Sequence, residues 1–569
     1  MQTDMKKRLP QGISNYERLI VDNCYYVDRT NFLEKLELIP NPYQFLLRPR
    51  KFGKSLFLSM MQYYYGVEYK ENFQKLFGEY YIGKNPTPLA NSFYVLKFDF
   101  SGIATYDKEK LVKSFHGSVY SSLEIWNGTY KLLTDAKMQE IKQEEEPAGI
   151  LKQFFAKVTD LSEHPILILI DEYDHFTNEL LSFDFELFKT SVAQNGFVRK
   201  FFEVIKTFTG TGLVARMFAT GVTPVTLDSL TSGFNVSKNL SLEPAFNEIM
   251  GFTDEEVLTM LEYYEVEDPK RVHFDMRDYY NGSKFAKRVE RKLYNSNMVL
   301  YFLDSITRTK SYPDGLMDVN IMSDYKKIGN IFLLGDEDVS NKRVQEILSS
   351  GEIAAELTIQ FSFEREFTPD DLISLLYYNG LLTIKGEDFG SMVFTIPNYV
   401  IRELYWKYFA QKLEKESHIS INSSELQAAM KQMALEGRID LYMSIINNTM
   451  KDLSNRDLQN FDEKYVKMLF MAFSSLSPIY YKKSEYEANR KYPDLLFLST
   501  PVIPVENQML FEFKYLKISE SHRLAEKFAE ATNQIQNYLE LDEINQIKNL
   551  HSYAIVFVGV EGNWKEVIK

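Results

Sequence analysis

Residues Tyr43 to Met60 of this chain read YQFLLRPRKFGKSLFLSM. They place Gly53-Lys54-Ser55 between a short apolar run and an amphipathic one, which is the order of strand, loop and helix in a phosphate-binding loop. In such a loop the backbone N–H groups and the positive end of the helix hold polyphosphate. The Lys neutralises the β and γ oxygens and the Ser hydroxyl binds Mg²⁺. The stretch therefore predicts a nucleotide site lined by Arg50, Lys51, Phe52, Gly53, Lys54, Ser55 and Leu56.

One position departs from the usual pattern. A glycine is expected five residues before Gly53, and this chain has Arg48 there. Two interpretations therefore stay open, a phosphate-binding loop and a basic strand-to-helix turn without a catalytic role.

A second half of a nucleotide site follows downstream. His164-Pro165 leads into the aliphatic run Ile166 to Ile170, and Asp171-Glu172-Tyr173-Asp174 comes directly after it. So short an aliphatic run is typical of a strand buried on both faces of a parallel sheet. Ligands bind at the carboxyl ends of such strands, so Asp171 is expected to hold Mg²⁺ and Glu172 to polarise a water for attack on the γ-phosphate. The alternative is a core strand followed by a solvated acidic turn.

The next expected strand, Ala215 to Thr220, ends in a polar residue. Many NTPases place a γ-phosphate sensor after the strand that follows the acidic one, which makes Thr220 a candidate. A threonine that merely caps an ordinary strand is an equally good interpretation.

Composition favours a multi-domain enzyme. The 569 residues are 45% hydrophobic and 14% aromatic, which is ample for two to four packed cores. No run has the apolar length of a signal peptide or a membrane span, so a cytoplasmic location without membrane contact is expected. The single Cys24 excludes an intramolecular disulfide and a cysteine-based zinc cluster.

The formal net charge of −14 argues against a protein that coats nucleic acid nonspecifically, because that binding depends on basic residues. It leaves a local groove open. The basic clusters Arg48-Pro49-Arg50-Lys51 and Lys482-Lys483 are expected to be solvated faces unless a site lies beside them.

Three parts are expected along the chain. Strands alternate with helices up to residue 252, which predicts an α/β domain with a parallel sheet. From Thr253 to residue 414 the pattern is helical, and a helix stopped at Asn379-Gly380 before a strand suggests a winged-helix or lid subdomain. A polar boundary from Glu414 to Ser424 opens a separate module over residues 415–569.

The last module carries a second set of chemical residues. Pro493-Asp494 precedes one apolar run, and the next run contains Glu512-Phe513-Lys514. In a strand Glu512 and Lys514 share a face, and Asp494 on a neighbouring strand could join them. Two carboxylates would bind a divalent cation, Mg²⁺ or Mn²⁺, and the Lys would steady the nucleophile. Gln534 and Tyr538 lie one helical turn apart. The plain alternative is a solvated strand face.

These motifs together resemble known families. The N-terminal part looks like the AAA-ATPase-like family common in bacteria, and the C-terminal part resembles the PD-(D/E)xK nuclease superfamily, in the variety that adds a Gln-x-x-x-Tyr helix as RecB-type nucleases do. The first resemblance rests on YVDRT (Tyr26 to Thr30), RPRKFGKSLFLSM (Arg48 to Met60), ILILIDEYD (Ile166 to Asp174), FATGVTPV (Phe218 to Val225), FNEIMGFTDEEV (Phe246 to Val257) and YNGSKF (Tyr280 to Phe285).

The resemblance implies an α/β P-loop NTPase domain that uses ATP and Mg²⁺ through Lys54, Ser55, Asp171 and Glu172. It also implies phosphodiester cleavage by Asp494, Glu512 and Lys514, with Glu487, or else Glu485, as an upstream acidic residue. The glycine that relatives often carry before the Asp is replaced by the context Lys491-Tyr492-Pro493-Asp494.

Three functions are therefore weighed. The leading hypothesis is an ATPase coupled to a metal-dependent nuclease that acts on DNA or RNA, with assembly into a homo-oligomer left open. The second is a nucleotide-gated signalling or oligomerisation switch whose C-terminal fold only binds nucleic acid or a partner. The third is a scaffold with two inactive sites.

Overall fold

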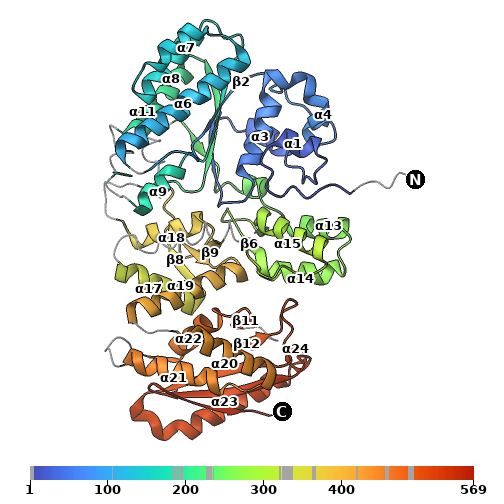
Figure 1. Ribbon diagram of the computed structural model, residues 1–569, viewed down its shortest axis with the longest axis vertical. Helices are drawn as coiled ribbons and strands as arrows, with labels where there is room; N and C mark the ends of the chain where they lie inside the picture. Colours follow the sequence, from blue (N-terminus) through green and yellow to red (C-terminus); the bar gives the residue numbers. More distant parts are fainter. Residues whose placement is uncertain are drawn as a thin grey trace, which may run out of the picture. The chain divides into compact units, whose positions relative to one another are not determined.

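The computed structural model describes residues 6–568 except for 106, 184–186, 189–190, 192–195, 226–233, 235, 319–321, 323–336, 362–366, 418–420, 455–460 and 485–492 (Figure 1). The chain forms two compact units. The first comprises residues 1–310, 315–344 and 352–399, and the second comprises residues 311–314, 345–351 and 400–569. The division into residues 1–252, 253–414 and 415–569 stays a prediction.

A five-stranded sheet organises the first unit. Its order is β2-β3-β4-β1-β5 and every neighbouring pair is parallel. Every residue of β3 is buried, as its continuous aliphatic sequence requires of a central parallel strand. The carboxyl ends of β1, β3 and β4 therefore lie at one edge, and the predicted parallel sheet is confirmed. The strands are β1 (Tyr43–Leu47), β2 (Tyr94–Asp99), β3 (Ile166–Asp171), β4 (Val214–Gly221) and β5 (Lys238–Asn239).

Helices cover both faces of this sheet (Figure 1). On one face α3 (Lys54–Tyr65) begins directly after the loop that follows β1 and packs its apolar side on Val95, Leu167 and Leu169. On the other face Phe98 of β2 meets Phe201 of α11 with ring centroids 5.3 Å apart. The remaining helices of this part are α1 (Tyr16–Val21), α2 (Asn31–Glu37), η1 (Val67–Asn72), α4 (Phe73–Phe77), α5 (Tyr81–Lys84), α6 (Lys108–Tyr130), α7 (Asp135–Lys142), α8 (Pro147–Val158), α9 (His175–Phe183), α11 (Phe197–Gly210) and η2 (Pro244–Ile249).

The middle of the chain is largely helical. Thr253 and Glu256 form a capping box at the start of α13, as the sequence predicts. The predicted helix before Asn379-Gly380 is α18, and β9 follows it in a three-stranded antiparallel sheet of order β8-β10-β9. The elements are α13 (Asp254–Tyr263), α14 (Pro269–Tyr280), β6 (Asn281–Ser283), β7 (Leu293–Tyr294), α15 (Ser296–Thr309), α17 (Glu337–Ser350), β8 (Glu352–Ala355), α18 (Pro369–Tyr378), β9 (Thr383–Asp388), β10 (Ser391–Thr395) and α19 (Tyr399–Ser417).

A mixed five-stranded sheet of order β11-β12-β13-β14-β15 organises the second unit. β13 and β14 are parallel, and the other pairs are antiparallel. Leu510 packs with Ala531 and Ile535 of α23, whereas Phe513 meets Phe470 of α22, so the two helices use opposite faces of β13. The elements are α20 (Ser423–Glu436), α21 (Asp440–Ser454), α22 (Glu463–Ser474), β11 (Tyr481–Ser484), β12 (Leu495–Leu498), β13 (Gln508–Leu516), η4 (Ile518–Arg523), α23 (Leu524–Leu539), α24 (Asp542–Asn545), β14 (Leu550–Val558) and β15 (Glu561–Glu566).

Lys482 of β11 corrects the prediction of a solvated basic face. Its side chain is 1% exposed, and its Nζ lies 3.1 Å from Oε2 of Glu403 on α19. The same ammonium donates to the carbonyls of Ser474 and Ser477, so it is paired in the interior of the second unit. Burial lowers the pKa of Lys482, and Glu403 opposes this change. Sequence could not reveal the pair because 79 positions separate its members in the numbering.

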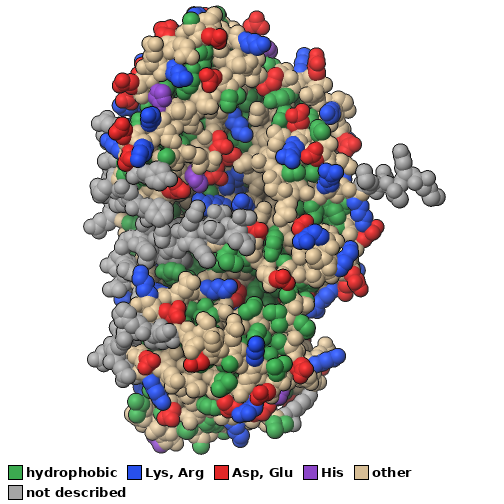
Figure 2. All heavy atoms as spheres, in the orientation of Figure 1, with side chains coloured by type: hydrophobic (Ala, Val, Ile, Leu, Met, Phe, Trp, Pro, Cys, Tyr) green, Lys and Arg blue, Asp and Glu red, His purple; other side chains and the backbone are tan. Residues whose placement is uncertain are grey.

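The surface is charged with both signs. Figure 2 shows Lys and Arg side chains interspersed with Asp and Glu on the face that it draws. In the part of the chain that the structure describes, no helix has the length and apolar character needed to cross a membrane.

Candidate active sites

In the loop between β1 and α3, the backbone carbonyls accept hydrogen bonds from other parts of the protein. One side of the loop is therefore left without carbonyl oxygens. The carbonyls of Arg48 and Pro49 accept hydrogen bonds from Lys54 Nζ at 3.0 and 3.1 Å. The carbonyl of Arg50 accepts from Asn295 Nδ2 at 3.0 Å. The carbonyls of Lys51 and Phe52 accept from Gly251 and from Ser296 and Asn297 at the start of α15. Five consecutive acceptors are therefore satisfied within the protein.

The last two carbonyls contact the chain around α15. The N–H of Asn297 donates to the carbonyl of Lys51 at 3.4 Å. The N–H of Gly251 and the hydroxyl of Ser296 both donate to the carbonyl of Phe52 at 3.3 Å. In a trans peptide the N–H points opposite to the carbonyl, so the N–H groups that follow these carbonyls face the other way. That is the arrangement of an anion-binding nest ahead of a helix N-terminus.

Gly53 is required by the backbone at this place. Its φ is +102°, in the left-handed region, and a Cβ built on it would find no atom within 4 Å. Lys51 also has a positive φ of 67°. The space in front of Gly53 is therefore open, as a loop that admits a phosphate requires.

Arg48 has a structural role, and the prediction that its cluster is solvated is wrong for this residue. Its side chain is 1% exposed, and its guanidinium donates to the carbonyls of Leu47, Ser241 and Phe246. It also lies over the ring of Phe285, 4.1 Å from the centroid. Burial lowers the pKa of Arg48 to about 10. The large side chain that replaces the first loop glycine therefore anchors the start of the loop to the chain at Ser241 and Phe246.

Asp171 ends β3 beside the start of α3. Its carboxylate lies beside the Ser55 side chain, and it is 3% exposed. Burial raises the pKa of Asp171, while Ser55 and Lys54 lower it. Lys54 is also buried, which lowers its pKa, and Glu172 and Asp171 oppose that change. A hydroxyl and a carboxylate in contact beside a buried ammonium fit the ligand set of a nucleotide-bound Mg²⁺.

Glu172 is held in a particular conformation. Its φ is +51°, and its Oε2 lies 3.1 Å from Nδ1 of His175 on α9. Burial raises its pKa, but the contact with His175 and the charges of Lys54 and Arg50 together bring the pKa of Glu172 to about 2. The same contact raises the pKa of His175. Glu172 is therefore ionised, as a residue that polarises water must be.

The side chains of Asp174 and Thr220 make hydrogen bonds that join neighbouring strands of the sheet. Asp174 is fully buried and accepts from the N–H groups of Val222 and Thr223 and from the Thr223 hydroxyl. Thr220 is also fully buried, and its hydroxyl donates to the carbonyl of Leu46 at 2.8 Å. This contact suits a threonine that caps a strand, and the sensor role of Thr220 stays a prediction.

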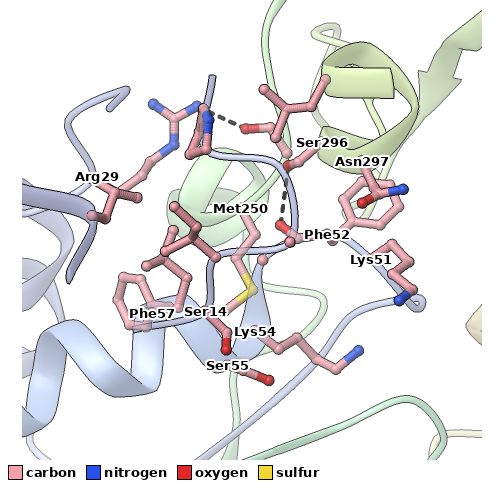
Figure 3. A pocket seen from close by; sticks show the side chains of 18 of the residues that line it. Ser14, Arg29, Lys51, Phe52, Lys54, Ser55, Phe57, Met250, Ser296 and Asn297 are labelled. Atoms are coloured by element: carbon pink, nitrogen blue, oxygen red, sulfur yellow. Dashed lines mark hydrogen bonds between the residues drawn. The ribbon is translucent and has the colours of Figure 1, made fainter. Parts of the chain in front are cut away.

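A cavity of about 530 Å³ opens beside the loop (Figure 3). It is lined by residues 50–57 together with Glu172 and His175, and by apolar side chains that include Ile13, Tyr25 and Met250. A cavity of this size that combines polar and apolar lining suits a nucleoside triphosphate, whose phosphates need donors and whose base needs an apolar surface.

The second site gathers three predicted residues of the C-terminal sheet. Lys514 Nζ lies 2.9 Å from Oε1 of Glu512, and Oδ2 of Asp494 accepts from the N–H of Phe513 at 2.9 Å. Glu512 is 3% exposed and Lys514 is 8% exposed. The predicted convergence of these side chains therefore exists in the fold.

Glu512 has one unsatisfied carboxylate oxygen and a raised pKa. Its Oε2 is buried and has no hydrogen-bond partner. Burial first, and then the charges of Asp494 and Glu463, raise the pKa of Glu512 to about 7 although Lys514 lowers it. A divalent cation at Oε2 would satisfy this oxygen and favour the ionised form, so the residues fit such an ion.

The Gln-x-x-x-Tyr helix reaches the same place. Burial, and then the charges of Glu512 and Asp494, raise the pKa of Tyr538, which places its hydroxyl near both carboxylates. Gln534, one turn earlier on α23, has an Oε1 atom that is buried without a partner.

Two residues near this site were not predicted. Glu463 begins α22, and burial raises its pKa while Lys514 lowers it and Asp494 raises it, which places its charge close to both. Lys467, one turn further on, has its Nζ 3.7 Å from Oδ1 of Asp494. The acidic first turn of an amphipathic helix, FDEKYVKML, was the available signal. Glu487 and Glu485, the predicted upstream acids, lie outside the described residues.

The described residues alone do not complete a metal centre. Within them, no group of three or more His, Cys, Asp or Glu side chains is arranged to hold a metal ion. The fit at Glu512 therefore rests on its unsatisfied oxygen and on the neighbouring Asp494.

Comparison with known proteins finds a family model over each of the two regions that contain these sites. Residues 10–231 match the family model described as predicted AAA-ATPase, and residues 461–567 match the PD-(D/E)XK nuclease superfamily. Both resemblances read from the sequence are thereby confirmed. A protein of Azotobacter chroococcum mcd 1, described as an uncharacterized protein in the vnfD 5′ region, is 25% identical over 291 residues. The aligned part is 49% of this chain and 48% of that protein, so the chain spans about half the length of this relative.

Proposed function

We propose that this chain, in which a predicted AAA-ATPase domain precedes a PD-(D/E)XK nuclease superfamily domain, hydrolyses ATP and cleaves DNA or RNA, with the first activity controlling the second. The observation that carries the proposal is the presence of two separately built sites, the carbonyl-free side of the loop at Gly53 and the unsatisfied oxygen of Glu512. Because ATP and nucleic acid are cytoplasmic substrates, the proposal places the protein in the cytoplasm.

In the first site the loop N–H groups and Lys54 would bind the β and γ phosphates. Lys54 would exchange its contacts with the carbonyls of Arg48 and Pro49 for phosphate oxygens. Ser55 and Asp171 would hold Mg²⁺, which neutralises charge on the phosphates. Glu172, ionised at neutral pH, would accept a hydrogen bond from the attacking water and orient it.

In the second site Asp494 and Glu512 would hold the cation, and the charge of Glu463 would lie close to them. Mg²⁺ or Mn²⁺ would supply a nucleophile at neutral pH and polarise the phosphodiester. Lys514 would release Glu512 and stabilise the negative charge that develops on the phosphate. Tyr538, whose hydroxyl lies near Glu512, would help to orient the carboxylate around the cation.

The ATP site is tested by binding and turnover of Mg²⁺·ATP with the Lys54→Ala variant. Loss of the buried ammonium should reduce ATP affinity at least tenfold, since it removes charge-assisted hydrogen bonds to phosphate. Lys70→Ala, at an exposed position on η1, is the matched control. Failure of the wild type to bind Mg²⁺·ATP would refute the ATPase half of the proposal.

The nuclease site is tested with DNA and RNA substrates in the presence of Mg²⁺ or Mn²⁺. Asp494→Ala and Glu512→Gln should each abolish cleavage, and Glu543→Gln, an exposed carboxylate on α24, should leave it unchanged. Equal cleavage by Asp494→Ala and the wild type, or no cleavage by either, would contradict the nuclease assignment and favour the switch described next.

One observation favours the second function, a nucleotide-gated switch that binds nucleic acid or a partner without cutting. Lys467 lies 3.7 Å from Asp494, so a cation already stands beside the carboxylate that should hold the metal. Under this alternative the wild type binds nucleic acid, leaves it intact with both metals, and changes its assembly state with ATP.

A further inference from the structure

The phosphate-binding loop is fixed by residues far beyond the matched ATPase segment. Asn295 is 5% exposed and lies just before α15. Its Nδ2 donates to the carbonyl of Arg50 at 3.0 Å. Its neighbours Ser296 and Asn297 contact the carbonyls of Phe52 and Lys51. The matched segment ends at residue 231, so the nucleotide site is completed by a later part of the chain.

The Asn295 amide performs two tasks with its two ends. Its Oδ1 accepts from the N–H groups of Asn297 and Met298 at 3.1 and 3.4 Å and so caps α15. Its Nδ2 is the donor to Arg50. A single side chain therefore joins the first turn of α15 to the middle of the loop.

The donor matters for the direction of the loop peptides. The carbonyl of Arg50 can face Asn295 only if the N–H of Lys51, which belongs to the same peptide, points to the opposite side. Lys51 adopts a positive φ of 67°, which costs free energy that a hydrogen bond to the preceding peptide offsets. Without the donor, the peptide between Arg50 and Lys51 is free to turn its oxygen toward the phosphate.

We propose that Asn295 is a positioning residue for nucleotide binding, which holds the phosphate-binding loop in its receptive conformation from the start of α15. This inference rests on the proposed ATPase function. It also makes α15 the element that responds when a nucleotide enters, because the same amide is shared by the loop and by the helix.

The two tasks are separated by Asn295→Ser. Serine is about as good an N-cap as asparagine, but its hydroxyl is too short to replace the amide donor at Arg50. We expect the dissociation constant and the KM for Mg²⁺·ATP to rise about five- to tenfold, as for the loss of one buried hydrogen bond, while kcat stays within about twofold. The melting temperature should stay within about 2 °C of wild type.

Asn422→Ser is the matched control. Asn422 caps α20 through the N–H groups of Ser424 and Glu425, and it lies in the second unit. This variant should bind Mg²⁺·ATP as the wild type does. Equal affinity of Asn295→Ser and wild type for Mg²⁺·ATP would overturn the inference.

A second variant covers the case in which Asn295→Ser does not fold. Asn295→Asp keeps the cap and replaces the donor by an acceptor that repels the Arg50 carbonyl, so it should weaken Mg²⁺·ATP binding more than serine does. If neither variant folds, Asn295 serves folding and the positioning role is refuted. If the wild type itself binds no Mg²⁺·ATP, the proposed function fails first and this inference falls with it.

Discussion

Gly53 gives the most local test of the phosphate-binding loop. At φ +102° an alanine is strained by roughly 1 kcal/mol, and its methyl group would stand in the open space where a phosphate is proposed to lie. Gly53→Ala should therefore reduce Mg²⁺·ATP affinity at least tenfold with only a small fall in melting temperature. Isothermal titration and differential scanning calorimetry measure the two quantities.

Gly212 offers the matched control for that variant. It also has a positive φ, +81°, a methyl group added to it would meet no atom within 4 Å, and it lies in the turn before β4. Gly212→Ala should show the same strain and an unchanged ATP affinity. A parallel loss of affinity in both variants would mean that strain, not the phosphate site, is responsible.

Glu512 predicts a pH dependence for metal binding. Its pKa of about 7 means that the metal-free protein holds a proton there at lower pH, and a cation must displace it. Mn²⁺ affinity should fall about tenfold for each pH unit below 7 and level off above it. Titration of Mn²⁺ between pH 5.5 and about 8.5, the range that brackets this pKa, measures the effect. A flat profile contradicts it.

The same raised pKa has a consequence for stability. Between the ordinary value of 4.5 and about 7, folded Glu512 retains a proton that the unfolded chain has released. The free energy of unfolding of the metal-free second unit should therefore fall as pH rises through this window. Addition of Mn²⁺ above pH 7 should restore it, because the cation binds the ionised form.

The sequence predicted proximity mainly for residues that share a face of one strand or one helix. Glu512 and Lys514 are two apart in β13, and Ser55 follows the loop that meets the end of β3. Arg48, Glu463 and Asn295 could not be assigned in this way. Their partners come from distant positions, and neither their residue types nor their spacing announces a long-range contact.

At the scale of elements, Asp174 joins the ends of two strands. It follows β3 and accepts three hydrogen bonds from Val222 and Thr223 after β4, while Tyr173 donates to the carbonyl of Thr223. Asp174→Ala should lower the free energy of unfolding by about 3 kcal/mol, because it leaves buried N–H donors without acceptors. Thermal and urea unfolding measure the loss.

Asp135→Asn, an exposed change in the first turn of α7, is the control and should cost less than about 0.5 kcal/mol. If Asp174→Ala is equally mild, the carboxylate does not hold the two strand ends together. The sequence indicated Asp171 and Glu172 as functional residues. It gave no sign that Asp174, the third acidic residue of the same run, has a structural role instead.

The elements themselves were largely predictable. The aliphatic run of β3, the alternation in β13 and the capping box of α13 specify their structures locally. Strand order was not predictable from such signals, because β4 enters between β1 and β3 only through tertiary pairing.

For the whole molecule, the coupling of the two activities is the decisive prediction. Glu172→Gln should retain Mg²⁺·ATP binding and lose hydrolysis, because the amide cannot polarise water as the carboxylate does. If ATP binding controls the nuclease, Glu172→Gln with ATP should keep the cleavage rate of the ATP-bound wild type throughout the reaction. Lys54→Ala should show the cleavage rate of the ATP-free wild type whether or not ATP is present. Single-turnover cleavage with and without ATP measures both.

Asp494→Ala is the reciprocal control, since it should lose cleavage and keep ATP turnover. Cleavage rates that are the same with and without ATP in the wild type would show two independent enzymes on one chain. The coupling, unlike the two folds, has no local signal in the sequence because it depends on how a change in one domain reaches the other.

The ion pair of Lys482 and Glu403 determines which N-terminal boundary suits a fragment that contains the nuclease-superfamily domain. A fragment that starts at residue 415 would leave the ammonium of Lys482 in an apolar interior without its counter-ion. One that starts at residue 399 keeps all of α19 and the pair together. The longer fragment should be the one that expresses as a well-behaved domain, so a failed excision at 415 would reflect the choice of boundary rather than an inability of the module to fold alone.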